Sequence, residues 1–334
     1  MIRIVGPVRA EPLMRQIAGL LAHAGRPAVV TATESRDLLS LSNMTGTTLL
    51  VCLMVPCGAR EMAAMPGLRG IVSPLVGYDW IDIDEATRRS IWVVNGEVRE
   101  SRESMAEATI MLMLTLLYRL RETEAELRSG GDRVRNRSML KGRTVGIVGY
   151  GGITREIVQR LQCWHANILV HTREAPPDAP GVSFVSRDHL LAVSDVVLLM
   201  TRLDDANRHL LDKGRLECMK RGVLLVNTAR GGLVDETALV EALESGQVGA
   251  AALDVFEVEP LPSDHPFRRL PNVILTPHSV GHTAQMLERI PHEAAANIIR
   301  LLDGHIPDSC KNRQAMVKPV PLSAGPCARS PPSA

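Results

Sequence analysis

The sequence predicts an α/β protein whose core is a doubly wound parallel sheet, and three observations support this fold class. Short apolar runs alternate with helical stretches along most of the 334 residues, as they do in consecutive βα units. The run 144–148 enters a glycine-rich turn that opens a helix, as in a dinucleotide-binding βα unit. Three later apolar runs end in polar residues, and ligands of open α/β sheets bind at the carboxyl ends of strands.

The N-terminal part of the chain predicts the first of these units. An apolar run at 2–5 precedes a helical stretch near 13–24. Two further strand-like runs follow at 48–55 and 68–73. Each is short and bounded by turn residues, which is typical of buried strands.

A single long helix is predicted from 104 to 127. Its first half is apolar almost all round, which is typical of a helix buried between layers. Ser104 and Glu107 have the spacing of a capping box, so we expect the helix to begin at Ser104. The polar stretch 129–137 predicts a loop.

The second half of the chain predicts the main sheet. Strand-like runs are predicted, in order, at 144–148, 167–171, 195–200, 222–227, 250–255 and 272–275. Helical stretches lie between most of them, so the sheet is predicted to be doubly wound. The tail 317–334, rich in Pro, Ser, Gly and Ala, predicts disorder.

The composition argues against several classes of protein. The net charge of +1 lacks the basic excess of a nucleic-acid-binding surface. The longest apolar stretch, 108–118, falls short of the roughly 20 residues of a membrane span, and the N-terminus lacks the pattern of a secretory signal. Six cysteines show neither a C-x-x-C pair nor a Cys/His metal spacing. We therefore expect reduced thiols, no metal site, no membrane and no nucleic-acid partner, in a cytoplasmic protein.

The turn after the run 144–148 predicts a dinucleotide site. Gly149 permits the tight turn, and Gly151 lets the backbone approach a pyrophosphate at the N-terminus of the next helix. Thr154 stands where the motif has its third glycine, and an ordinary βα turn without a ligand is the alternative interpretation. The predicted cofactor contacts in this turn are Gly149, Tyr150, Gly151, Gly152 and Ile153.

The residues that end the second strand of this unit favour NADP over NAD. An acidic side chain there would bind the ribose hydroxyl of NAD, but the strand ends in His171-Thr172-Arg173. Arg173 would attract a 2′-phosphate and Thr172 could donate a hydrogen bond to it. We expect NADP or NAD, with a preference for NADP; the alternative is that Arg173 is only a solvated loop cation.

Three segments downstream resemble the arginine, glutamate and histidine motifs of the D-isomer-specific 2-hydroxyacid dehydrogenases. They are 226–235, 253–260 and 275–281, and they follow one another in the order and spacing of that family. Upstream, 77–82 resembles the family's substrate loop and 104–107 the start of its interdomain helix. Together these motifs are far more specific than any one of them.

The resemblance implies a role for each polar residue. Reducing a 2-keto acid puts negative charge on the carbonyl oxygen, which a general acid must protonate. The resemblance assigns this step to His278, with Glu259 stabilising the imidazolium and fixing the ring tautomer. Arg230 would bind the substrate carboxylate through its fork of donors, and the backbone amides of Val76 and Gly77 would bind its other oxygen.

The resemblance also implies an architecture and further contacts. A Rossmann NAD(P) domain, 100–284, would be inserted into a smaller flavodoxin-like substrate domain made of 1–99 and 285–316, with a final helix at 283–302. Family members are usually dimers, so we expect a homodimer. The further cofactor contacts that the resemblance implies are Thr228, Ala229 and Asp254.

Several alternatives stay open at this point. In the charged segment 96–103, Arg99 and Arg102 would either recognise a second anionic group of a substrate or pair with neighbouring glutamates in a solvated loop. Formate dehydrogenases share the arginine and histidine motifs but carry glutamine where Glu259 stands. A nucleotide-sensing corepressor of the same fold would retain much of the triad. Glyoxylate, hydroxypyruvate and pyruvate all remain candidate substrates.

Overall fold

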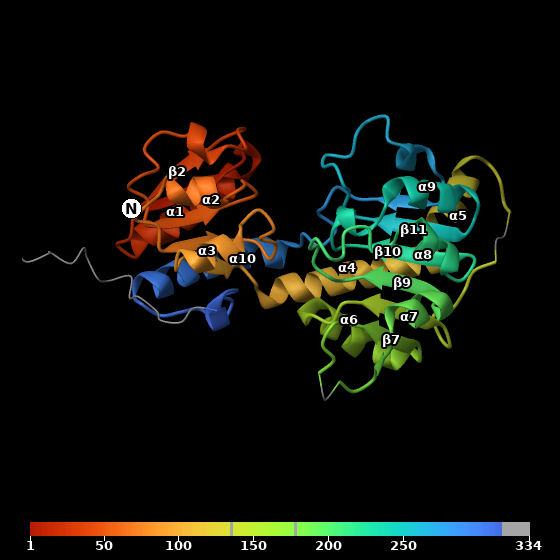
Figure 1. The fold of residues 1–334 in the computed structure, drawn as a ribbon. Coiled ribbons are helices and arrows are strands. Elements are labelled where there is room, and N and C mark those ends of the chain that lie inside the picture. The colour runs from red at the N-terminus through yellow and green to blue at the C-terminus, as the bar shows by residue number, and fades with distance from the viewer. Residues whose placement is uncertain (134–135, 177–178, 316–334) are drawn as a thin grey trace, which may run out of the picture. The chain divides into compact units, whose positions relative to one another are not determined.

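The computed structural model describes residues 1–133, 136–176 and 179–315 (Figure 1). They form two compact units, one made of Met1–Ser101 together with the segment from Thr283 onward, the other of Arg102–His282. Each unit is built on its own sheet, and every pair of neighbouring strands in both sheets is parallel. The predicted α/β fold with doubly wound parallel sheets is confirmed. The predicted tail lies outside the described residues.

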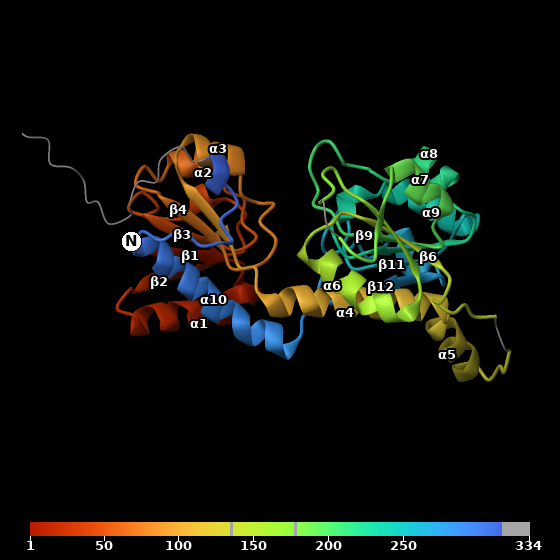
Figure 2. The same ribbon diagram turned by 90° about the horizontal axis from the view of Figure 1, so that it is seen from below.

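The first unit has a five-stranded sheet in the order β2-β1-β3-β4-β5, which is the flavodoxin-like order. Figure 2 shows α1 and α10 together on one face of this sheet, and α2 and α3 on the other. Because helices cover both faces, the central strands are buried apolar runs. The elements are β1 (Ile2–Gly6), α1 (Glu11–His23), β2 (Ala28–Ala32), β3 (Leu49–Cys52), α2 (Ala59–Ala63), β4 (Gly70–Ser73), α3 (Ile83–Arg88), β5 (Trp92–Asn95) and α10 (Ala284–Leu302).

Two strands of this sheet are absent from the sequence prediction. β2 is an edge strand whose residues are mostly half-exposed, so it lacks a continuous apolar run. β5 is fully buried, and its short apolar run between Ser90 and Gly96 is the signal that would have revealed it. The predicted final helix is present as α10, with the Thr283 side chain accepting a hydrogen bond at its N-terminus.

The second unit has a seven-stranded sheet in the order β12-β11-β10-β9-β6-β7-β8. Counted along the unit, this is the 3-2-1-4-5-6 order of a dinucleotide-binding sheet with one strand added at its far edge. Helices α4 and α6 cover one face, and α7, α8 and α9 the other (Figure 2). The elements are β6 (Thr144–Val148), α6 (Gly152–Leu161), β7 (Asn167–His171), β8 (Ser183–Phe184), α7 (Arg187–Val193), β9 (Val196–Leu199), α8 (Lys213–Cys218), β10 (Val223–Asn227), α9 (Glu236–Glu244), β11 (Val248–Leu253) and β12 (Val273–Leu275).

The prediction of one long helix from 104 to 127 is wrong in its start and in its continuity. Helix α4 spans Arg99–Leu117, and α5 (Leu120–Arg128) follows after a break. The break is at Arg119, whose φ of 50° is left-handed and ends the α4 hydrogen-bond ladder. Part of the charged segment 96–103, for which a solvated loop was one of two alternatives, therefore supplies the first turn of α4.

The predicted capping box at Ser104 is also wrong. Ser104 lies inside α4 and is buried, and its hydroxyl donates a hydrogen bond to the carbonyl of Gly281. The spacing of a capping box is present, but the helix continues upstream through the charged residues from Arg99, because tertiary context overrides the local signal.

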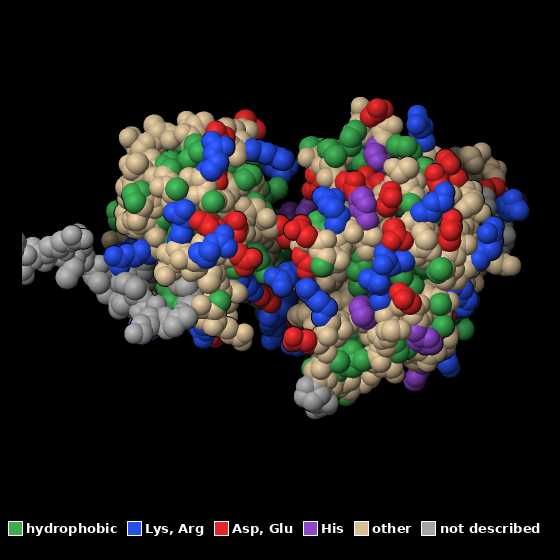
Figure 3. All heavy atoms as spheres, viewed as in Figure 1, with side chains coloured by type: hydrophobic (Ala, Val, Ile, Leu, Met, Phe, Trp, Pro, Cys, Tyr) green, Lys and Arg blue, Asp and Glu red, His purple; other side chains and the backbone are tan. Residues whose placement is uncertain are grey.

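The surfaces of the two units carry mixed charge. On the face drawn in Figure 3, acidic and basic side chains are interspersed rather than separated by sign. Among the described residues, none of the helices combines the length and apolar character that a membrane crossing requires.

Candidate active site

The glycine turn after β6 leaves its backbone open to a ligand. Gly149 has a φ of 107°, and a β-carbon there would lie 2.6 Å from the Met200 carbonyl oxygen, so only glycine fits. Gly151 precedes the first residue of α6, and a β-carbon on it would meet nothing within 4 Å. The turn is therefore tight on its inner side and open on its outer side, as a close approach by a pyrophosphate requires. The dinucleotide that the fold implies fits this cradle.

Thr154, in place of a third glycine, is part of the turn. Its side chain is buried, and its hydroxyl donates a hydrogen bond of 3.0 Å to the carbonyl of Gly149. The hydroxyl thus satisfies a carbonyl of the strained turn residue. The amides at the start of α6 are not used by this bond.

Tyr150 and Ile153 anchor the turn to the unit. The Tyr150 ring packs edge-on against Phe184 with centroids 5.3 Å apart, and the Arg155 guanidinium lies 5.5 Å from its centroid. Ile153 packs against the core between α6 and the sheet. Both side chains therefore pack within the unit itself.

Strand β7 ends at His171, so Thr172 and Arg173 lie at the carboxyl edge of the sheet. The Thr172 side chain is half-buried. Arg173 is 73% exposed and forms an ion pair of 3.1 Å with Asp204 on the loop after β9. No sequence pattern predicts this carboxylate, because Asp204 lies on a different loop from Arg173.

The turn after β10 positions Arg230. The Asn227 side chain accepts a hydrogen bond from the amide of Ala229 and donates one to the carbonyl of Arg230. Thr228 is buried, and its hydroxyl lies 3.0 Å from that of Thr109 on α4. These bonds hold the backbone that carries the arginine.

Arg230 lies beside the loop that carries Glu259. A β-carbon on the next residue, Gly231, would lie 1.9 Å from the carbonyl carbon of Phe256, so the two loops touch through their backbones. The positive charge of Arg230 contributes to lowering the pKa of Glu259.

His278 and Glu259 form the central pair of the site. The His278 Nδ1 lies 2.8 Å from Glu259 Oε2. Because a carboxylate only accepts, Nδ1 carries the hydrogen of this bond and Nε2 is the nitrogen left for a substrate. Burial raises the pKa of Glu259, but the hydrogen bond from His278 and the nearby charges outweigh it, so the pKa lies below its ordinary value. Glu259 therefore stays ionised as a partner for the ring.

Asp254 has a positioning role that sequence reasoning missed. It is buried, and its Oδ1 accepts hydrogen bonds from the Thr276 hydroxyl (2.7 Å) and from the amides of Ser279 (3.0 Å) and Val280 (3.2 Å). Its carbonyl accepts from the amide of His278, whose φ of 52° is unusual for a residue with a side chain. Asp254 thus fixes the loop of His278, whereas the sequence predicted a cofactor contact for it.

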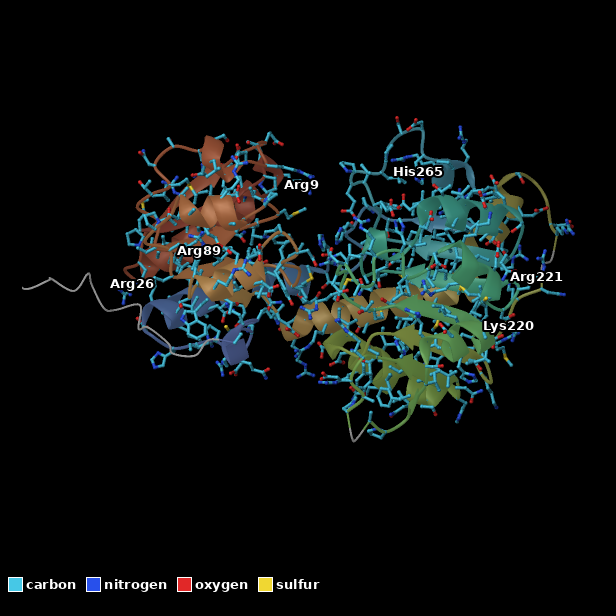
Figure 4. All side chains as sticks on the ribbon, in the orientation of Figure 1. Arg9, Arg26, Arg89, Lys220, Arg221 and His265 are labelled. Carbon is cyan, nitrogen blue, oxygen red and sulfur yellow. The ribbon has the colours of Figure 1, made fainter. Side chains whose placement is uncertain are left out.

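A second pair of a histidine and a glutamate, both half-buried, supports the loop of Glu259. Glu236, at the start of α9, accepts a hydrogen bond of 2.9 Å from the amide of Glu257, and its other oxygen lies 3.2 Å from His265 Nε2. Burial raises the pKa of Glu236. Neither Glu236 nor His265 was predicted, because only their contact across two loops reveals the role. His265 is labelled in Figure 4, on the loop after β11.

In the other unit, the turn after β4 shows how Val76 and Gly77 are presented. The carbonyl of Val76 accepts a hydrogen bond from the Asn95 side chain, and that of Gly77 accepts one from the Ser73 hydroxyl. Among the described residues, neither amide of this pair donates a hydrogen bond. The turn thus has the two unused donors that a carboxylate requires.

The site residues between 144 and 280 thus lie at the carboxyl ends of the strands of the second sheet. Lys220 and Arg221, on the loop that leads into β10, lie at the opposite ends of the strands, where the strands begin (Figure 4). Among the residues that the structure describes, no group of three or more His, Cys, Asp or Glu side chains could hold a metal ion.

Comparison with known proteins places this chain in a family. Residues 110–280 match the family model of the D-isomer specific 2-hydroxyacid dehydrogenase NAD binding domain. A glyoxylate reductase of Thermofilum pendens is 37% identical over 298 residues, which cover 86% of this chain and 87% of that protein.

Solved structures agree with this. A D-lactate dehydrogenase from Aquifex aeolicus, complexed with NAD and lactic acid, superposes with a TM-score of 0.80 at 26% identity, covering 91% of this chain and 96% of that chain. A glyoxylate reductase from Paecilomyes thermophila gives a TM-score of 0.82 at 27% identity, covering 94% and 99%. The chain belongs to the D-isomer specific 2-hydroxyacid dehydrogenases, NAD(P)-dependent oxidoreductases that act on a CH–OH group, as the resemblance predicted.

Proposed function

We propose that this enzyme reduces a small 2-keto acid to the D-2-hydroxy acid, with His278 as the acid–base group. The observation that carries this proposal is the 2.8 Å contact of His278 Nδ1 with Glu259, which leaves Nε2 as the proton donor. Arg230 and the amides of Val76 and Gly77 bind the substrate carboxylate. Glyoxylate is the first substrate to test, because relatives with this sequence similarity are named glyoxylate reductases.

The domain roles follow from the site. Arg102–His282 holds the dinucleotide, through the glycine turn and through Thr228 and Ala229, while the unit of Met1–Ser101 and Thr283 onward binds the substrate. When bound, the nicotinamide supplies the hydride for reduction or accepts it in oxidation.

The residues of the chain move one proton and stabilise charge. During reduction the carbonyl carbon gains a hydride, and the carbonyl oxygen gains the proton of His278 Nε2. The ring is left neutral and takes a new proton from solvent. Glu259, ionised throughout, stabilises the imidazolium and keeps the hydrogen of Nδ1 in place. Arg230 binds the substrate carboxylate and so holds the neighbouring carbonyl group in position for attack.

The test of this function is turnover. Purified protein is mixed with NADPH or NADH and glyoxylate, hydroxypyruvate, pyruvate or formate's oxidised counterpart, carbon dioxide, and the loss of nicotinamide absorbance is followed. We expect loss with at least one 2-keto acid and none with carbon dioxide. Tight nucleotide binding with no turnover of any keto acid would contradict the proposal and favour a nucleotide-sensing protein.

For the cofactor, we propose that Thr172 and Arg173 recognise the 2′-phosphate of NADP. Support comes from their position directly after β7, from the exposure of Arg173, and from the lack of a carboxylate at 172. Asp204 holds the guanidinium at that edge in the absence of ligand, and the phosphate would take its place as the partner of Arg173.

Replacing Arg173 with alanine should lower the preference for NADPH over NADH by about tenfold to a hundredfold, as expected for the loss of a charge-assisted hydrogen bond. The ratio of kcat/KM for the two cofactors measures this. Asp204→Asn is the matched control: it releases the arginine, so it should preserve or raise that preference. An unchanged cofactor ratio in Arg173→Ala would refute the assignment.

We further propose a homodimer formed through the second unit. Five large apolar side chains on and after α4 and α5 are 45–73% exposed, and they would supply the apolar part of such an interface. They are Met111, Tyr118, Leu120, Leu127 and Met139.

The mass in solution tests this interface. Wild type should sediment as a dimer at micromolar concentration, and Leu120→Glu combined with Leu127→Glu should sediment as a monomer, because two carboxylates cannot be buried unpaired. Val29→Glu, an exposed apolar position in the first unit, is the control and should remain dimeric. A monomeric wild type would exclude the dimer.

A further inference from the structure

The end of β5 lies beside the turn that carries Val76 and Gly77. Strand β5 is parallel to β4, the strand that leads into this turn. Asn95, the last residue of β5, is 1% exposed, and its side-chain nitrogen Nδ2 donates a hydrogen bond of 2.8 Å to the carbonyl of Val76. The next residue, Gly96, donates its backbone amide to the carbonyl of Leu75 at 3.0 Å. Two consecutive carbonyls of the turn are therefore held from the end of β5.

The peptide geometry links these two carbonyls to the two unused amides of the turn. In a trans peptide unit, the carbonyl and the N–H group lie in one plane and point in opposite directions. The carbonyl of Leu75 shares its unit with the amide of Val76, the carbonyl of Val76 shares its unit with the amide of Gly77, and neither unit is cis. The bonds from Gly96 and Asn95 therefore direct both amides away from the end of β5.

The backbone of the turn also touches the backbone after β5. A β-carbon on Gly96 would lie 1.9 Å from the carbonyl oxygen of Pro74, so only glycine fits at this position. Pro74 has a fixed φ, and both residues are buried. The bond from the Gly96 amide is thus built into the backbone, whereas the bond from Asn95 depends on its side chain and can be removed by substitution.

The Asn95 side chain serves the turn more than it serves the rest of the fold. Among the described residues, no group donates a hydrogen bond to its buried Oδ1. A buried acceptor without a donor costs folding free energy, and an apolar side chain, like the others of β5, would avoid that cost. Asn312 is a contrast, because it is also buried but donates to the carbonyl of Ile91 (2.8 Å) and accepts from the amide of Val93 (3.1 Å).

We propose that Asn95 is a positioning residue for substrate binding, which aims the amide of Gly77 at the carboxylate of the 2-keto acid. The inference rests on the proposed function, in which the amides of Val76 and Gly77 bind that carboxylate. The carboxylate keeps its charge and its donors throughout hydride transfer, so a misplaced donor weakens the binding of substrate and transition state equally. Asn95 should therefore determine the KM of the keto acid rather than kcat.

Steady-state kinetics with the keto acid that wild type reduces best test this role. Asn95→Ala removes the donor and should raise KM by about tenfold to a hundredfold while kcat stays within about threefold. The retained kcat shows that the unit is folded. Asn95→Asp has nearly the same volume, but a carboxylate cannot donate to the Val76 carbonyl, so it should raise KM at least as much. The Kd of NADH should be unchanged in both variants, because the glycine turn belongs to the other unit.

Asn312→Ala is the matched control, since it removes the same atoms from a second buried asparagine of the same unit. It should lower the melting temperature more than Asn95→Ala does, because it breaks hydrogen bonds of both the nitrogen and the oxygen of the side chain, but it should leave KM within about twofold.

The outcomes separate this inference from the proposed function. If wild type reduces a keto acid and the Asn95 variants keep KM within twofold, the role of Asn95 is refuted and the proposed function stands. An equal rise of KM in Asn312→Ala, or a loss of kcat without a change of KM in the Asn95 variants, would show that Asn95 acts only through the stability of the unit and would equally refute the role. If wild type reduces no keto acid, both proposals fail.

Discussion

Replacement of His278 by alanine is expected to lower the kcat of keto-acid reduction by about three orders of magnitude, within the range of roughly 10² to 10⁴ for loss of a general acid. The imidazole is the group whose Nε2 is available to protonate the carbonyl oxygen, because its Nδ1 is engaged by Glu259. Water would have to supply the proton in the variant. Steady-state rates at saturating cofactor and substrate measure the loss.

Two readouts separate loss of the acid from damage to the fold. The Kd of NADH should stay within about twofold of wild type, because His278 lies on a different loop from the glycine turn. Glu259→Gln should cost only about tenfold in kcat, since the amide keeps a hydrogen bond but not the charge. A His278→Ala variant with more than a tenth of wild-type kcat would show that another group donates the proton.

Replacement of Arg230 by lysine should lower kcat/KM for the keto acid by about 10² to 10³-fold, although the charge is kept. A guanidinium presents two parallel donors to a carboxylate, and an ammonium cannot match that geometry. The backbone of Arg230 is also held by Asn227 and by the close contact of Gly231 with Phe256. A lysine at this position therefore cannot restore the contact with the substrate carboxylate through a small shift of the backbone.

The control for Arg230→Lys is the same substitution at Arg221. That residue is exposed on the loop before β10, at the opposite edge of the sheet (Figure 4). Arg221→Lys should leave kcat/KM unchanged. The Kd of NADH should also stay unchanged in Arg230→Lys, so that the whole effect lies in substrate binding and turnover. Retention of kcat/KM within threefold in Arg230→Lys would exclude the bidentate contact.

Six strands of the second unit could be predicted well, because they are mostly buried apolar runs with turn residues at each end, whereas the short edge strand β8, with one exposed and one half-buried residue, was not predicted. The predicted runs 144–148 and 167–171 have the bounds of β6 and β7. The edge strand β2 could not be predicted in this way, since its half-exposed residues carry no continuous apolar signal. The predicted bounds of α4 are wrong because tertiary packing, and not the local capping pattern at Ser104, decides where that helix begins.

In the candidate site as well, some residues could be predicted from the sequence and others could not. Residues that follow strands in recognisable motifs, such as Arg230, Glu259 and His278, could be proposed from the sequence. The residues that hold them could not: Asp254 supports the His278 loop through side-chain contacts across loops, and Glu236 supports the Glu259 loop with His265.

The stereochemistry of oxidation tests the central claim most directly. The enzyme is incubated with NADP⁺ or NAD⁺ and, separately, with the D and L enantiomers of the chiral 2-hydroxy acid whose keto acid it reduces best, lactate or glycerate, and formation of reduced nicotinamide is followed. Reduced nicotinamide should form with the D enantiomer, and His278→Ala should abolish it. Oxidation of the L enantiomer, or of neither one by a protein that binds the cofactor tightly, would contradict the assignment of this site to D-2-hydroxy acids.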